Sequence, residues 1–95
     1  MKLHKEIIPV VFGVIEQPII TIKLKRDTVV LDIQLQDNQL VMWYSFYDNA
    51  SSMLDKQIQI LVGTTGNSFI CPYNFKYIKT IQWDLYAIHL WAKGL

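Results

Sequence analysis

Alternation of apolar and polar residues at a period of two is the feature that most constrains how this chain can fold. Over residues 28–36, Val29, Leu31, Ile33 and Leu35 share one face of an extended segment, and the residues between them are mostly polar. Successive side chains of a strand point to opposite faces, so this pattern is typical of a half-buried β-strand. The sequence therefore predicts a strand here.

A hairpin follows from the residues that come next. Asp37 and Asn38 both tolerate the positive φ angles of a tight turn, and Leu40–Tyr47 is rich in residues that favour strands. With a two-residue loop, one face pairs Leu35 with Leu40, Ile33 with Met42, Leu31 with Tyr44 and Val29 with Phe46. The other face pairs Gln34 with Val41, Asp32 with Trp43 and Val30 with Ser45. Because every pair of the first set is apolar, the sequence predicts this register.

The rest of the chain has the same character. Further strands are predicted at Ile7–Phe12, Ile19–Leu24, Lys56–Val62, Tyr77–Gln82 and Leu85–Trp91. The last two form a closing hairpin around Trp83 and Asp84, with a loop of either two or three residues. Residues 48–55 and 66–74 are predicted loops. We expect one all-β domain over residues 1–95, with six to seven short, mainly antiparallel strands. A hairpin-rich twisted sheet, a small sandwich and an open barrel all fit.

The apolar content is high for so short a chain. Of its 95 residues, 52% are hydrophobic and 18% are charged, whereas average soluble domains are about 25% charged. A domain of this size buries only about two thirds of its unfolded surface. We therefore expect a homo-oligomer, in which a second copy covers part of the remaining apolar surface.

Charge and processing signals limit the partners and the location. The net charge of +1 gives no basic footprint for a nucleic-acid partner. The single cysteine, Cys71, excludes an internal disulfide and favours a reducing compartment. The apolar run at residues 7–15 is interrupted by Pro9 and Gly13, is too short to span a membrane and lacks a signal cleavage site. We expect a cytoplasmic protein without membrane contact.

The segment from Gly63 to Gly66, which encloses Thr64 and Thr65, is the stretch most suggestive of a binding site. A phosphate-binding P-loop has a longer glycine spacing, a lysine and a following helix, and none of these is present. Glycines here can serve a turn or bulge. Backbone N–H groups and the two hydroxyls can equally hold a ligand, so the sequence leaves both interpretations open.

Residues for catalysis or metal binding are sparse. His89 lies in a predicted strand, and His4 is the only other histidine. No His or Cys spacing typical of a metal site is present, and Cys71 has no recognisable histidine partner. We therefore expect a protein that is not an enzyme and that needs neither a cofactor nor a metal.

Aromatic residues carry more information than the titratable ones. Trp43 falls on the polar face of the predicted hairpin, and Trp91 shares a strand face with His89. Tryptophans on a sheet face favour a contact surface for a protein or a stacked base. A second core layer would bury the same side chains, and the sequence alone does not separate the two.

Several short motifs are similar to those of one family. "LDIQLQDNQLVMWYSF", "ILVGTTGN", "YIKTIQ" and "AIHLW" follow one another along residues 29–91. This order resembles a family of small, uncharacterised phage and prophage domains, which have a tryptophan strand, a Val-Gly-Thr-Gly-like loop, a Tyr-Ile-Gly-Thr element and a terminal Trp-His-Val-Phe-like strand. Lys79 stands where the family has glycine, and Thr65 is an additional loop residue. The resemblance implies a phage accessory protein in the cytoplasm of a bacterial host.

Two functions follow as expectations. The first is a non-catalytic module that counteracts bacterial antiviral defence by sequestering a small, nucleotide-derived signalling ligand. Its binding residues would be Trp43, Gly63, Thr64, Thr65, His89 and Trp91. The second is a protein-interaction module, either an inhibitor of a host protein or a virion accessory, that docks through an apolar sheet face or strand edge.

Overall fold

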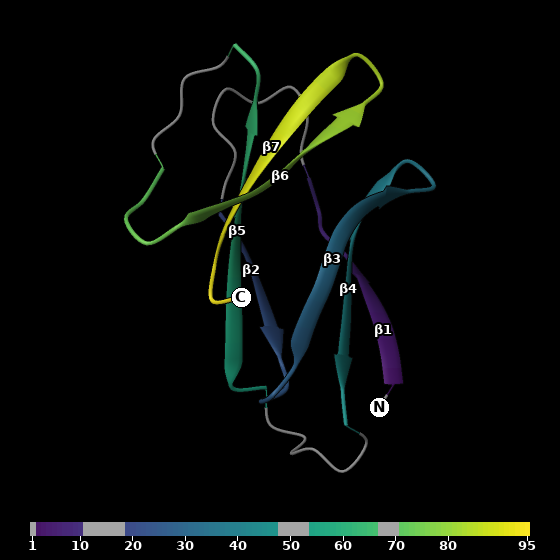
Figure 1. The fold of residues 1–95 in the computed structure, drawn as a ribbon, viewed down its shortest axis with the longest axis vertical. Helices are drawn as coiled ribbons and strands as arrows, with labels where there is room; N and C mark the ends of the chain where they lie inside the picture. The colour runs from purple at the N-terminus through teal and green to yellow at the C-terminus, as the bar shows by residue number, and fades with distance from the viewer. Residues whose placement is uncertain (1, 11–18, 48–53, 67–70) are drawn as a thin grey trace.

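The chain folds into antiparallel strands that form two sheets. The computed structural model describes residues 2–10, 19–47, 54–66 and 71–95, and within these ranges it contains strands and no helix. The strands are β1 (Lys2–Ile7), β2 (Ile20–Leu24), β3 (Val29–Gln36), β4 (Gln39–Phe46), β5 (Lys56–Thr64), β6 (Lys76–Trp83) and β7 (Tyr86–Lys93). One sheet has the order β1-β4-β3 and the other the order β2-β5-β7-β6 (Figure 1). The predicted all-β class is confirmed.

The hydrophobic core lies between the two sheets. The three-stranded sheet contributes Ile33, Leu40 and Met42, all of them buried. The four-stranded sheet contributes Ile22, Leu24, Ile58, Ile60, Val62, Trp83, Ile88, Leu90 and Ala92. Each sheet thus turns one face inward, and the architecture is a small two-sheet sandwich in which the sheets remain separate. No helix in the described residues is long and apolar enough to span a membrane.

The β3–β4 hairpin forms with the predicted register near its turn. Asp37 and Asn38 have φ angles of 50° and 61°, as both central residues of a type I′ turn require. The observed pairs that agree with the prediction are Leu35–Leu40, Ile33–Met42, Gln34–Val41 and Asp32–Trp43. Turn chemistry and the apolar pattern therefore determine this half of the hairpin.

A β-bulge at Leu31 makes the predicted register wrong in the other half. The partner of Val30 is Tyr44, and the partner of Val29 is Ser45. The predicted pairs Leu31–Tyr44, Val29–Phe46 and Val30–Ser45 are therefore not formed. An inserted residue reverses the faces of everything before it. Val30 accordingly packs against the core, and Leu31 is 52% exposed.

The closing hairpin has a two-residue turn and a bulge of its own. Trp83 pairs with Tyr86, so the turn consists of Asp84 and Leu85, one residue later than predicted. The bulge falls at Ile78, because Tyr77 pairs with Trp91 and Lys79 pairs with Leu90. One of the two loop lengths left open by the sequence is thereby selected.

The first strand lies earlier than predicted. The sequence predicts a strand at Ile7–Phe12, whereas β1 runs from Lys2 to Ile7 and ends two residues before Pro9. Proline has no backbone N–H for a ladder, which explains why the strand does not continue. Residues 11 and 12 lie outside the described residues, as do most of the predicted loop at 48–55 and residues 67–70 of the loop at 66–74.

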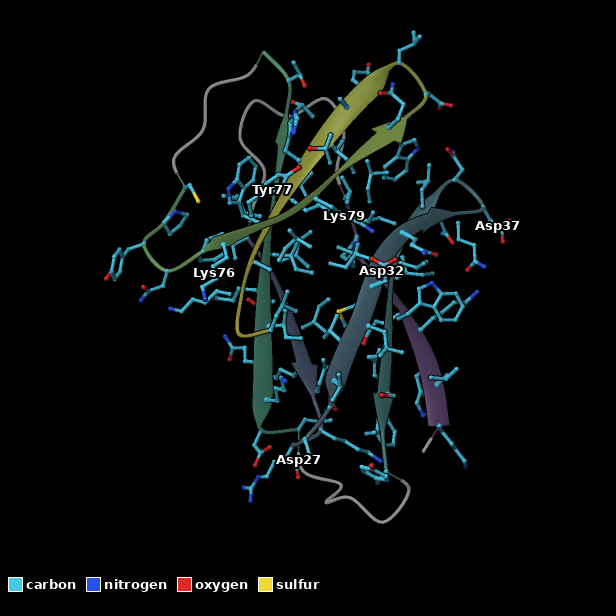
Figure 2. The ribbon with its side chains drawn as sticks, viewed as in Figure 1. Asp27, Asp32, Asp37, Lys76, Tyr77 and Lys79 are labelled. Atoms are coloured by element: carbon cyan, nitrogen blue, oxygen red, sulfur yellow. The ribbon has the colours of Figure 1, made fainter. Side chains whose placement is uncertain are left out.

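An ion pair joins the two sheets where the edge strand β3 meets the edge strand β6, a place called the seam below. Lys79 Nζ lies 2.6 Å from Asp32 Oδ1 and donates a second hydrogen bond of 3.0 Å to the carbonyl oxygen of Ile33 (Figure 2). The hydrogen bond from Lys79 lowers the pKa of Asp32 below its ordinary value of 3.8. The seam is therefore closed by a charged contact.

Candidate functional site

The outer face of the four-stranded sheet brings together most of the residues singled out in the sequence. His89 on β7 lies opposite Gly63 of β5 on one side and opposite Thr80 of β6 on the other. Trp91 lies two residues further along β7, opposite Leu61 of β5 on one side and opposite Tyr77 of β6 on the other. Residues two apart in a strand share a face, so His89 and Trp91 are neighbours at the centre of this surface.

A chain of hydrogen bonds runs across this surface. The Tyr77 hydroxyl lies 2.5 Å from Thr80 Oγ1, which lies 2.8 Å from His89 Nδ1. On the other side of the ring, His89 Nε2 lies 2.7 Å from Thr65 Oγ1. We call Thr65, Tyr77, Thr80, His89 and Trp91 together the histidine face. Both imidazole nitrogens are bonded to hydroxyl groups, so the orientation of the ring is fixed.

The same hydrogen bonds can form with either tautomer of His89. The Thr65 hydroxyl lies 2.7 Å from His89 Nε2 and 3.5 Å from the Ala87 carbonyl oxygen, so its contact with the ring is the closer one. A hydroxyl can donate or accept, and Thr80 and Thr65 can therefore meet a ring nitrogen that carries a proton or one that does not. The network thus joins four side chains without an acidic group.

Aromatic rings border the network on one side. Tyr77 and Trp91 are in edge-to-face contact, with centroids 5.7 Å apart and planes at 72°. The Trp91 centroid lies 6.3 Å from that of the His89 ring. Tyr77 is exposed and Trp91 is half-buried. The face therefore presents ring surface beside oriented hydroxyls, an arrangement suited to holding a planar polar molecule.

The charges on this outer face are of one sign. Lys93 follows Trp91 by two residues on β7, and Lys23 lies on the same outer face in β2; both side chains are exposed. The remaining positions of this face in the described strands are Thr21, Gln57, Gln59, Leu61, Gly63, Tyr77, Thr80, Gln82, Ala87, His89 and Trp91. None of them is acidic. The surface thus favours an anionic ligand over a cationic one.

Two of the expected binding residues lie elsewhere. Trp43 is in the other sheet, on β4, opposite Asp32 and Lys5, and Lys5 Nζ lies 5.7 Å from the centroid of its ring. Thr64 pairs with Ile88, which is buried in the core, so its register belongs to the inner face. Gly63, Thr65, His89 and Trp91 are the four expected residues that the fold brings together.

The second histidine does not join the first. His4 stacks on Phe46 of the three-stranded sheet, with centroids 4.4 Å apart, and more loosely on Tyr44. Among the described residues, no group of three or more His, Cys, Asp or Glu side chains is placed to hold a metal ion.

Tyr77 and Thr80 are members of the site that residue spacing could not identify. Three residues apart, they would point to opposite faces of a regular strand. The bulge at Ile78 removes one step of the alternation and places both side chains on the outer face. No protein-family model, curated protein or solved structure matches this chain.

Proposed function

We propose that the protein is a non-catalytic binding module that sequesters a small, nucleotide-derived ligand on the histidine face. The observation that carries the proposal is the hydrogen-bonded chain from Tyr77 through Thr80 and His89 to Thr65, placed beside the ring of Trp91. A nucleobase has the planar surface and the edge donors and acceptors that match these groups. The lysines at positions 23 and 93 supply positive charge for a phosphate on the same face.

The energetics require several contacts at once. A stacked base contributes about 1–3 kcal/mol and a neutral hydrogen bond about 1 kcal/mol. A complex with a micromolar Kd needs about 8 kcal/mol. Stacking on Trp91, hydrogen bonds to the network and a lysine–phosphate contact must therefore act together. Loss of the ring alone is expected to weaken binding about 10- to 100-fold.

The biological role proposed here comes from the sequence resemblance. The order of short motifs along residues 29–91 resembles that of small phage and prophage domains, and on this basis we propose an accessory protein in the cytoplasm of an infected bacterium. There it lowers the free concentration of a signalling nucleotide used in antiviral defence. Sequestration needs affinity and abundance and no chemical step, which fits a site built from rings and neutral hydroxyls.

The test is a binding panel with a matched pair of variants. Isothermal titration calorimetry is run with mononucleotides, cyclic dinucleotides and a short single-stranded oligonucleotide. Trp91→Ala is compared with Trp43→Ala, because both tryptophans are half-buried on the outer face of a sheet. We expect a cyclic dinucleotide or mononucleotide to bind the parent protein, and only Trp91→Ala to weaken it. Equal losses in both variants, preference for the oligonucleotide, or no binding by any of these probes would each overturn the proposal.

Exposed apolar residues on the outer face of the three-stranded sheet favour a second function. Leu3, Ile7 and Val29 are exposed on the outer face of the three-stranded sheet, where their partners are Ser45 and Val41. An exposed apolar sheet face is typical of a protein contact. In this alternative the chain is an interaction module, an inhibitor of a host protein or a virion accessory, that docks through this face.

A further inference from the structure

A pocket of about 530 Å³ lies at the end of the sandwich where the turns of both hairpins meet. One wall is the segment from Ile7, the last residue of β1, to Val10. The other walls come from residues 38–40 of the β3–β4 hairpin and from Trp83, Asp84 and Tyr86 of the β6–β7 hairpin. Its volume is within the range of about 300–1,000 Å³ found for small-molecule sites.

A hydrogen bond between the two hairpins holds the pocket walls in place. The indole Nε1 of Trp83 donates to Asn38 Oδ1 at 2.8 Å, which ties one turn to the other. Asn38 has a φ of 61° and Asp84 has a φ of 51°, so both turns adopt tight left-handed backbone conformations. Asn38 and Asp84 therefore border the pocket from two short turns that the hydrogen bond holds together.

The residues that line the pocket indicate which kind of ligand fits it. Ile7, Ile8, Pro9, Val10 and Leu40 provide an apolar lining, to which Trp83 and Tyr86 add ring surface. Among the described residues that line the pocket, Asp84 alone carries a charge, and it is exposed at the rim. The walls therefore favour a compact apolar body, and the rim favours a positive charge.

We propose that this pocket is a binding site for a small organic cation, consisting of one hydrocarbon or aromatic ring and a primary ammonium group. The ring lies against Ile7, Pro9 and Tyr86, which line the pocket and are exposed, and the ammonium group pairs with the carboxylate of Asp84. This site is separate from the histidine face: it shares no residue with it, and its charge preference is the opposite one. It therefore stands whether or not the histidine face binds a nucleotide.

The probe that tests the site is 2-phenylethylamine, and 3-phenylpropionate is its counterpart of opposite charge. The two are titrated into ¹⁵N-labelled parent protein while backbone and indole N–H shifts are recorded. We expect saturable shifts with the amine at millimolar or lower concentration, centred on Leu40, Trp83 and Tyr86. The carboxylate is expected to bind at least about tenfold more weakly, because it repels Asp84. This comparison needs no variant, so it is independent of any effect of mutation on folding.

Two turn aspartates provide a matched pair of variants. Asp84→Asn removes the charge and keeps a residue type that adopts positive φ readily. Asp37→Asn makes the same change at the other hairpin turn, where Asp37 has a φ of 50° and is not among the residues that line the pocket. We expect Asp84→Asn to weaken binding of the amine about tenfold and Asp37→Asn to leave it unchanged. Shifts centred on another surface, equal binding of amine and carboxylate, or equal effects of the two variants would overturn the assignment.

Discussion

Asp32 and Lys79 are 47 residues apart in the chain, and their side chains meet in a 2.6 Å ion pair that joins the two sheets. Each is the first residue after a β-bulge, at Leu31 in β3 and at Ile78 in β6. Bulges redirect the side chains that follow them. The two irregularities thus aim opposite charges at each other across the seam, and the contact depends on both.

The ion pair predicts a stability difference that depends on pH. Asp32→Asn should lower the free energy of unfolding at neutral pH by about 0.2–1 kcal/mol, a small value because both side chains are partly exposed. Lys79 lowers the pKa of Asp32 in the folded state. The stabilisation is therefore present above the ordinary pKa of an aspartate and is lost as the pH falls through the lowered value. Urea unfolding at neutral and strongly acidic pH measures both effects.

Asp37→Asn is the control for this prediction. Asp37 is an exposed aspartate at a turn, so its neutralisation should have little effect on stability at either pH. If the deficit of Asp32→Asn remained the same at acidic pH, its origin would lie in packing and not in the charge.

The bulge at Leu31 predicts an unusual contrast between two apolar residues of one strand. Leu31 is 52% exposed and Ile33 is 1% exposed, although strict alternation assigns them to the same face. Leu31→Thr should change stability by less than about 0.5 kcal/mol, as for a surface position. Ile33→Ala should cost about 2–5 kcal/mol, because it leaves a cavity in the core. Thermal unfolding measures the stability of both variants. Similar losses of stability would indicate that Leu31 is buried like Ile33, as in a regular register without a bulge.

At the β3–β4 turn, a substitution that turn propensity favours is expected to lower the stability of the whole domain. Asp-Gly is a preferred pair for a type I′ turn, so Asn38→Gly should strengthen an isolated hairpin. In this fold it removes the acceptor of the hydrogen bond from Trp83 Nε1, and we expect a net loss of about 1 kcal/mol. Asn38→Asp, which keeps an oxygen acceptor, should lose less. A glycine variant as stable as the parent would show that the contact between the hairpins contributes nothing.

Self-association stays a prediction from composition, and the fold suggests where to test it. Leu3 and Val29 are exposed on the outer face of the three-stranded sheet. We expect the parent protein to sediment as a dimer or larger, with upward of about 1,000 Å² buried. Leu3→Lys combined with Val29→Lys should shift it toward the 11.1 kDa monomer. Leu85→Lys, at a turn residue that is 95% exposed, is the control. A parent protein that is monomeric at micromolar concentration would contradict the expectation.

The sequence predicts the parts of the fold that depend on local chemistry. Asp37 and Asn38 adopt the positive φ angles that their residue types favour, and Leu35 faces Leu40 as the apolar pattern requires. The predicted register is wrong from Leu31 toward the start of β3, because no residue type marks the position of a bulge. Leu31 resembles a core residue in every local respect. Its exposure follows from how β3 pairs with β4 and meets β6, which are long-range contacts.

Only some members of the candidate site can be predicted from the sequence, because the others depend on a bulge. Gly63, Thr65, His89 and Trp91 were identified by residue type, and the pairing of β5 with β7 brings them together. Tyr77 and Thr80 share their face only because of the bulge at Ile78. The pairing of β6 with β7 was expected, whereas its register depends on a turn whose length the sequence left open. Sequence alone therefore supplies members of the site but not its boundary.

The seam also gives the amide proton of Ile33 an uncommon position. Ile33 N–H donates to Asp32 Oδ1 at 2.8 Å, and the carbonyl of the same residue accepts from Lys79. Amide protons on an open strand edge normally exchange quickly with solvent, since no neighbouring strand covers them. Here the acceptor is a carboxylate, whose strength as an acceptor falls when it takes up a proton. The exchange rate of this one amide consequently reports on the protonation of the Asp32 carboxylate at the seam.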